Sequence, residues 1–231
     1  MSNSNEVEIK PLEAAFLISF TFKTPTDGLN GKMTMHTTNG TSNHNGHEFV
    51  NLGLPSGTLW ATCNIGATSP EQAGLYFAFG ETKGYSAEQV KKGERSFDSA
   101  SYTAPSVSEN LNLEQDAAHV NLGGNWRMPT KAECQELIDN TTQTWTNDYN
   151  GTGVAGKVFT SKVNGNSVFF PAAGYCDNSF VDGVGSYGYY WSASWYSSSD
   201  TWYLDFGSGS QSLDYYNRYF GQSVRGVCEG V

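Results

Sequence analysis

The chain has 231 residues, a formal net charge of −10, 38% apolar and 14% aromatic residues, and 26 glycines. This much apolar surface is enough for a buried core, which argues against a disordered chain. The longest basic run is Lys91-Lys92, so the sequence lacks the patch that nucleic acid or anionic lipid would need.

Residues 1–40 are predicted to form a small β element. Alternating apolar and polar residues at 19–23 and 32–36 flank a turn signal at Asp27 and Gly28. We expect this element to serve for docking to a particle or for contact between copies of the chain.

The chain starts with the acidic sequence MSNSNEVEIKPLE, and its first apolar run covers only residues 14–18. These features predict neither a secretory signal nor insertion into a membrane. Residues 41–46 are rich in Asn and Gly and are predicted to be a linker. The main domain is then expected at residues 47–231.

Helix signals fall in the first half of the main domain. Capping boxes predict helices that begin at Ser69 and Thr130, since Gln or Glu follows three residues later, and a third helix is expected within residues 111–120. Residues 83–109 are predicted to be a surface loop. Short β-type runs are expected around the turn at 55–57 and at 157–163, 167–172, 202–206 and 223–227. This order predicts an α+β domain with an irregular β half.

Candidates for catalysis and metal binding are weak. Cys63, Cys134, Cys176 and Cys228 contain no C-x-x-C pair, which argues against structural zinc and favours free buried thiols, although three disulfide pairings stay open. Loops at 145–151 and 176–183 carry oxygen ligands suited to calcium but lack EF-hand spacing. No nucleophile elbow or phosphate loop occurs. We therefore expect no enzyme activity, no metal and no cofactor.

Residues 185–220 hold thirteen aromatic side chains but only four charged ones, among many Ser and Gly residues. Antibody paratopes have this composition, because Tyr and Trp supply large contact area at low entropic cost. Bulky residues are consecutive at 214–220, with no period that could bury them all. We therefore predict one exposed binding face, formed by Asp214, Tyr215, Tyr216, Tyr219 and Phe220 with Tyr196 and Tyr203.

Several motifs together carry a family resemblance: FVNLGLPSGTLWATCNIGATSPEQAGLYFAFGET, NLGGNWRMPT, FFPAAGY and GYYWSAS…WYLDF…NRYFGQSVRGV. Over residues 47–228 the chain resembles the variable proteins of diversity-generating retroelements, and equally the paralogous lipoprotein and adhesin domains of Bacteroidetes. The resemblance implies a C-type-lectin-like fold. In retroelement proteins, error-prone copying of adenines rewrites the end of the gene and so diversifies a ligand-binding face.

Mutated AAY codons reach Tyr, Ser, Asp, Gly, Phe and Asn but not Trp, Gln, Lys or Glu, which matches the composition of this segment. The resemblance implies variable, ligand-binding positions at Tyr196, Ser199, Asp200, Tyr203, Asp205, Gly207, Ser210, Asp214, Tyr215, Tyr216, Asn217, Tyr219 and Phe220. It implies a fixed scaffold at Trp126, Arg127, Trp191, Trp202, Leu204, Phe206, Arg218 and Val224.

The resemblance leaves three functions open. The first is a receptor-binding protein of a phage tail, and the second is a bacterial surface adhesin that is not diversified. The third is an enzyme on a scaffold like that of the formylglycine-generating enzyme, although Cys176 and Cys228 lie too far apart for its cysteine pair. The expected partner is a protein or glycan on a target cell.

Overall fold

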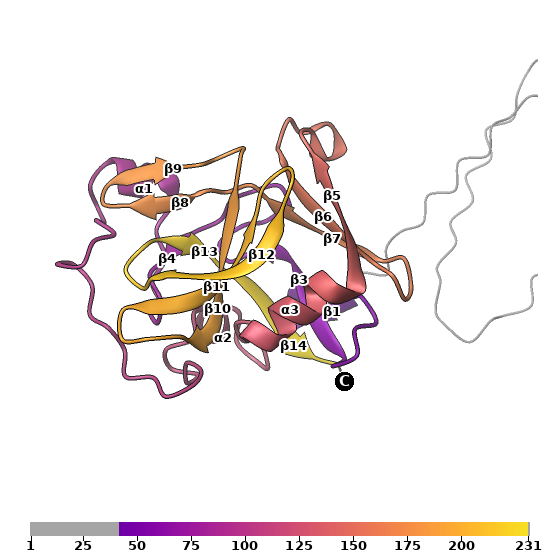
Figure 1. Ribbon diagram of the computed structural model, residues 1–231, viewed down its shortest axis with the longest axis horizontal. Helices are drawn as coiled ribbons and strands as arrows, with labels where there is room; N and C mark the ends of the chain where they lie inside the picture. Colours follow the sequence, from indigo (N-terminus) through magenta and orange to yellow (C-terminus); the bar gives the residue numbers. More distant parts are fainter. Residues whose placement is uncertain (1–41, 231) are drawn as a thin grey trace, which may run out of the picture. The chain divides into compact units, whose positions relative to one another are not determined.

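Figure 1 shows the computed structural model, which describes residues 42–230. This part of the chain is an α+β fold, built mainly from sheets with three short α-helices, as the sequence predicted. The β element predicted for residues 1–40 lies outside the described residues. The helices are α1 (Ala87–Lys91), α2 (Ala117–Leu122) and α3 (Lys131–Asn140), with a short 3-10 helix, η1, at Tyr149–Gly151.

The first sheet joins the two ends of the described chain. Its strand order is β1-β2-β3-β14, and all its pairs are antiparallel. In Figure 1 the yellow β14 returns to lie beside the indigo β3. The strands are β1 (Ser42–His44), β2 (His47–Asn51), β3 (Thr58–Asn64) and β14 (Arg225–Glu229).

A tight hairpin turn joins β1 to β2. Asn45 and Gly46 both have positive φ, at 50° and 84°, the conformation that Asn-Gly supplies in a two-residue turn. The linker prediction for residues 41–46 was therefore wrong for residues 42–46. Their polar composition is that of an exposed edge strand and its turn.

The second sheet has the strand order β12-β11-β10-β13-β4, which leaves β12 at one edge. β12 pairs with β11 and β11 with β10 in antiparallel fashion, whereas β13 runs parallel to β10. α3 packs against β10, β11 and β12. The strands are β4 (Tyr76–Phe77), β10 (Gly188–Trp195), β11 (Asp200–Phe206), β12 (Gln211–Asn217) and β13 (Gln222–Ser223).

Two smaller sheets complete the fold. A three-stranded antiparallel sheet has the order β5-β6-β7, and a two-stranded sheet pairs β8 with β9. Figure 1 shows β8 and β9 beside α1, away from the β5-β6-β7 sheet. The strands are β5 (Thr141–Thr146), β6 (Gly156–Ser161), β7 (Ser167–Pro171), β8 (Tyr175–Asp177) and β9 (Phe180–Asp182).

The helix predictions had mixed outcomes. The helices expected at Thr130 and within residues 111–120 correspond to α3 and α2. The helix expected at Ser69 is only a turn: Gln72, the expected partner of the Ser69 N–H, accepts instead from the backbone N–H and hydroxyl of Thr68. The predicted loop at 83–109 contains α1, which begins with a capping box of Ser86 and Gln89 and was not predicted.

Aromatic side chains from three sheets form the main core. Phe170 of β7 lies 5.1 Å from Phe159 of β6, 4.9 Å from Tyr190 of β10 and 5.8 Å from Trp60 of β3, measured between ring centroids. Phe206 of β11 stacks on Tyr190 at 5.7 Å. The first, second and third sheets therefore share one hydrophobic centre.

A buried arginine reinforces this junction. The guanidinium of Arg225 in β14 donates hydrogen bonds to the side chain of Asn64 (2.9 Å) and to the carbonyls of Ala61 (2.9 Å), Thr62 (2.8 Å) and Phe169 (3.0 Å). Its carbon Cζ lies 4.3 Å from the ring centroid of Phe170. Burial lowers the pKa of Arg225. One side chain thus links β14, β3 and β7.

Candidate functional site

Strands β11 and β12 carry most of the predicted binding residues. Trp202 pairs with Tyr215 across these strands, Tyr203 pairs with Asp214, and Thr201 pairs with Tyr216. Because successive side chains of a strand point to opposite faces, Tyr215 and Tyr216 lie on opposite faces of the sheet. The prediction that all these residues share one face was wrong.

On one face lies a group that we call the Trp202 cluster, consisting of Lys131, Tyr196, Trp202 and Tyr215. Tyr196 and Tyr215 stack with ring centroids 4.0 Å apart, and Trp202 meets them edge-on at 5.0 and 5.6 Å. Lys131 Nζ lies 3.2 Å from the centroid of the Trp202 ring. Tyr196 and Tyr215 are 41% and 43% exposed, as predicted.

Trp202 was predicted to be core scaffold, and it is only partly buried. Leu204 and Phe206 follow Trp202 on the same face of β11 and are buried in the core, whereas Trp202 lies beyond the end of that core. The indole is covered by Lys131 and two tyrosines instead of by core residues. Trp202 is therefore part of the candidate binding surface.

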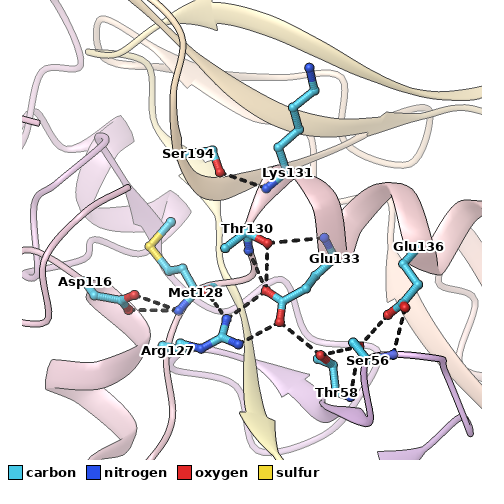
Figure 2. A network of polar contacts seen from close by, with 10 residues as sticks. All are labelled: Ser56, Thr58, Asp116, Arg127, Met128, Thr130, Lys131, Glu133, Glu136 and Ser194. Carbon is cyan, nitrogen blue, oxygen red and sulfur yellow. Dashed lines mark hydrogen bonds and ion pairs between the residues drawn. The ribbon is translucent and has the colours of Figure 1, made fainter. Parts of the chain in front are cut away.

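A polar network fixes the first turn of α3, from which Lys131 extends (Figure 2). Thr130 and Glu133 form the predicted capping box, and Arg127 donates two hydrogen bonds to the Glu133 carboxylate, at 2.6 and 2.7 Å. Thr58 of β3 donates to the same carboxylate at 3.0 Å. Figure 2 shows the Lys131 side chain pointing away from this network, so its ammonium is free to cover Trp202.

Replacing Glu133 by glutamine is expected to lower the free energy of unfolding at pH 7 by about 2 kcal/mol, since Arg127 loses a partly buried partner of opposite charge. Burial alone would raise the pKa of Glu133, but the hydrogen bonds from Arg127 and Thr130 and the charge of Arg127 lower it to about 2. The carboxylate thus stabilises the fold above its ordinary pKa of 4.5, and this contribution is lost as pH falls toward 2.

Chemical denaturation of the parent and the Glu133→Gln variant at pH 7 and pH 3 measures this difference, which we expect to be smaller at pH 3. Glu136→Gln is the control, because Glu136 lies on the same helix but accepts only from Ser56. A difference between the parent and Glu133→Gln that stays constant with pH would contradict the assignment.

On the opposite face lies a second group, the Tyr203 cluster, consisting of Tyr175, Tyr189, Tyr203, Tyr216 and Phe220. Its ring centroids form a closed circuit, with successive separations of 5.1, 5.7, 6.5, 4.7 and 5.7 Å. Tyr216 is 45% exposed, and Tyr175 and Tyr189 are partly exposed. Each of the five rings therefore lies next to two others, and Tyr175, Tyr189 and Tyr216 provide the exposed part of the cluster.

Two members of this cluster correct the exposure prediction. Tyr203 and Phe220 are each only 6% exposed. Tyr203 packs 5.9 Å from the buried Trp191, and Phe220 lies between Tyr175, Tyr216 and Tyr219. Aperiodic spacing suggested exposure, but Phe220 follows the end of β12 in a turn, where its N–H donates to the Asn217 carbonyl and its ring joins the core cluster of Trp191 and Tyr203.

Tyr175 and Tyr189 were missing from the predicted site. Tyr189 stands two residues before Trp191 on β10, and this alternation could have placed it on the Tyr203 face. Tyr175 comes from β8, about forty residues upstream of Tyr215. No local signal connects Tyr175 to the C-terminal strands.

The remaining predicted positions divide between the two ends of the strands. Ser199 and Asp200 lie at the start of β11, and Asp200 pairs with Asn217 at the end of β12. Gly207 and Ser210 lie at the other end, where Gly207 N–H donates to the Ser210 carbonyl at 3.0 Å. Gly207 is buried, which corrects its prediction as a contact residue, and Tyr219 is half-buried.

Acidic groups dominate the charge beside the Tyr203 cluster. Asp205 lies on the same strand face as Tyr203, and its Oδ1 atom is buried without a hydrogen-bond partner. Burial, and then the charge of Asp214, raise the pKa of Asp205, while Lys157 opposes them. Burial followed by the charge of Asp205 also raises the pKa of Tyr189, to about 12. Tyr189 is therefore neutral near pH 7, and Asp205 and Asp214 lie close enough to act on the cluster.

The predicted scaffold residues are buried apart from Trp202 and Arg127, which is partly exposed. Trp126 is 0% exposed, and its indole N–H donates to the carbonyl of His44 at 3.0 Å. Arg127 is held by the Glu133 ion pair and pairs through its backbone with Val227. The other buried members are Trp191, Leu204, Phe206, Arg218 and Val224.

Other candidate sites are sparse in residues 42–230. Within this range no group of three His, Cys, Asp or Glu residues could hold a metal ion, and no helix is long and apolar enough to cross a membrane. All four cysteines are free, and Cys134, Cys176 and Cys228 are buried, in line with the prediction of free thiols. A cavity of about 660 Å³ lies around Cys63, lined by residues of β2, β3 and α2, and contains no predicted binding residue.

Comparison with known proteins gives one family match. A family model described as a domain of unknown function (DUF8237) matches residues 141–227. This range runs from β5 into β14 and contains every member of both aromatic clusters except Lys131. No curated protein and no solved structure matches the chain.

Proposed function

We propose that the chain is a ligand-binding protein with a C-type-lectin-like fold, whose C-terminal strands form a recognition surface diversified by a retroelement. One observation carries the proposal. The edge strand β12 presents Tyr215 and Tyr216 to solvent on its two faces, each against a cluster of further aromatic rings. Exposed aromatic clusters of this kind are characteristic of recognition surfaces.

The division between buried and exposed residues also supports the proposal. The residues expected to be fixed fill the core, either because mutated AAY codons cannot encode them or because the family pattern includes them. They are Trp191, Leu204, Phe206 and Val224. The exposed residues Ser199, Ser210, Asp214, Tyr215 and Tyr216 are all of reachable types. A scaffold that keeps its stability in fixed residues can tolerate replacement of the surface.

The retroelement itself is tested at the nucleotide level. We expect a near-copy of the 3′ end of the gene beside a reverse-transcriptase gene, with differences only at adenines. In that case the chain is proposed to act in a phage tail or on a cell surface. If the locus has neither feature, the remaining proposal is that the chain is a bacterial adhesin that is not diversified.

Replacing Tyr215 and Tyr216 together by serine is expected to weaken binding to target cells at least about tenfold, because aromatic residues are typical hot spots. The free energy of unfolding should fall by at most about 2 kcal/mol, since both rings are exposed. The measurement is a thermal melt together with binding of labelled protein to a panel of intact bacterial strains.

Phe180→Ser is the matched control for this double variant. Phe180 lies on β9 and is the most exposed large hydrophobic residue in the described part of the chain, at 73%. We expect Phe180→Ser to bind cells like the parent. Equal binding by the parent, the control and the double variant would remove the support for recognition through β12.

A further inference from the structure

We propose that the Tyr203 cluster binds a lysine or arginine side chain of a protein ligand. This inference deepens the proposed function, on which it rests for the role of the surface. The binding surface is a closed circuit of adjoining rings, those of Tyr175, Tyr189, Tyr203, Tyr216 and Phe220. Asp205 and Asp214 place negative charge beside it.

The rings favour a cation. Cations bind at the faces of Tyr and Phe rings, and a set of several adjoining rings is the arrangement that recognises ammonium groups. Successive centroids in this circuit lie 4.7 to 6.5 Å apart. A side chain that enters over Tyr216, the exposed member, would therefore meet more than one ring.

Asp205 favours a cation that carries N–H groups. Its Oδ1 atom is buried without a hydrogen-bond partner, while the side chain as a whole is partly exposed, so a charged donor can approach it from outside and stabilise the incompletely satisfied carboxylate. A quaternary ammonium has no N–H to donate, and a neutral sugar hydroxyl would leave the charge uncompensated. Lysine and arginine supply both the charge and the donor, so a protein ligand fits better than a glycan.

The surrounding charges do not satisfy Asp205. Lys157 is the cation that acts on it, but its ammonium donates to the Ser210 carbonyl at 2.6 Å and to the Gln211 side chain at 2.9 Å. The other groups that act on the tyrosines of the cluster are acidic and include Asp177, Asp182 and Asp214. Among the described residues, therefore, no cation forms an ion pair with Asp205.

The test uses a short peptide, acetyl-Gly-Arg-Gly-Arg-Gly-amide, titrated calorimetrically into the full chain at low ionic strength. Companion peptides carry lysine or citrulline in place of arginine, and citrulline has nearly the shape of arginine without its charge. We expect the arginine and lysine peptides to bind at least about tenfold more tightly than the citrulline peptide. Equal affinities for the arginine and citrulline peptides would overturn the proposal.

Two variants locate the site. Asp205→Asn and Tyr216→Ser should each weaken binding of the arginine peptide about tenfold. Asp139→Asn removes one charge from α3, and Phe180→Ser removes one exposed ring outside both aromatic clusters, and neither should change the affinity. A thermal melt checks folding, which Asp205→Asn should preserve or improve because it removes a desolvated charge. An equal loss in Asp139→Asn would indicate nonspecific attraction to an acidic protein and overturn the site.

A glycan array separates this inference from the proposed function. Binding of neutral glycans that Tyr216→Ser abolishes, without binding of the basic peptides, would overturn the cation site and retain the recognition surface. If the parent binds neither peptides, glycans nor cells more tightly than the Tyr215 and Tyr216 double variant, both proposals fail.

Discussion

Replacing Trp126 by alanine is expected to lower the free energy of unfolding by about 3–5 kcal/mol, the usual result of emptying a buried tryptophan site. Trp126 is fully buried among Leu59, Ala61 and Cys228, and His44 and His47 lie against its ring at centroid distances of 5.9 and 6.3 Å. These contacts link the loop before α3 to the first sheet, so they cannot be replaced by a local rearrangement.

Chemical denaturation measures this loss, and Trp126→Phe is the control. Phenylalanine keeps most of the ring volume but loses the hydrogen bond to His44, so it should cost much less than alanine. A cost below about 1 kcal/mol for Trp126→Ala would show that the site collapses freely and that Trp126 is not an essential part of the scaffold.

Replacing Arg225 by methionine is expected to lower the free energy of unfolding by about 3 kcal/mol or more. Methionine fills a similar volume, but it leaves the carbonyls of Ala61, Thr62 and Phe169 and the side chain of Asn64 without their donor. Each buried acceptor that loses its partner costs about 1–3 kcal/mol. The loss should appear as a lower midpoint of denaturation.

Arg218→Met is the matched control, since Arg218 is also buried but donates one hydrogen bond, to the Ser198 carbonyl. We expect it to cost about 1 kcal/mol. Similar costs for the two substitutions would indicate that Arg225 acts through its volume and not through its hydrogen bonds.

The sequence predicted those helices and turns that depend on residues close together in the chain. Thr130 and Glu133 predicted α3 because a capping box is complete within four residues. Ser69 carried the same signal and formed no helix, because Gln72 accepts from Thr68 instead of from the Ser69 N–H. Thr68 stands next to Ser69, and the pattern alone does not decide between the two hydrogen bonds.

The candidate site was less predictable than the fold. The composition of residues 185–220 pointed to β11 and β12, but consecutive aromatic residues do not reveal which face each one occupies. The pairing of Tyr203 with Asp214 and of Trp202 with Tyr215 fixes that assignment, and it depends on the register of the hairpin. Tyr175 reaches the cluster through the tertiary arrangement of β8, for which the sequence carries no local signal.

The alternation along β12 limits how the gene can change. A substitution at Tyr215 or Tyr216 alters one cluster and leaves the opposite face intact. Insertion or deletion of one codon between Gln211 and Asp214 would move every later side chain of β12 to the opposite face of the sheet. If the change came before Leu213, it would also turn Leu213 away from Leu204. Copying errors that preserve length are therefore compatible with this strand, whereas errors that slip by a single codon would disrupt its packing.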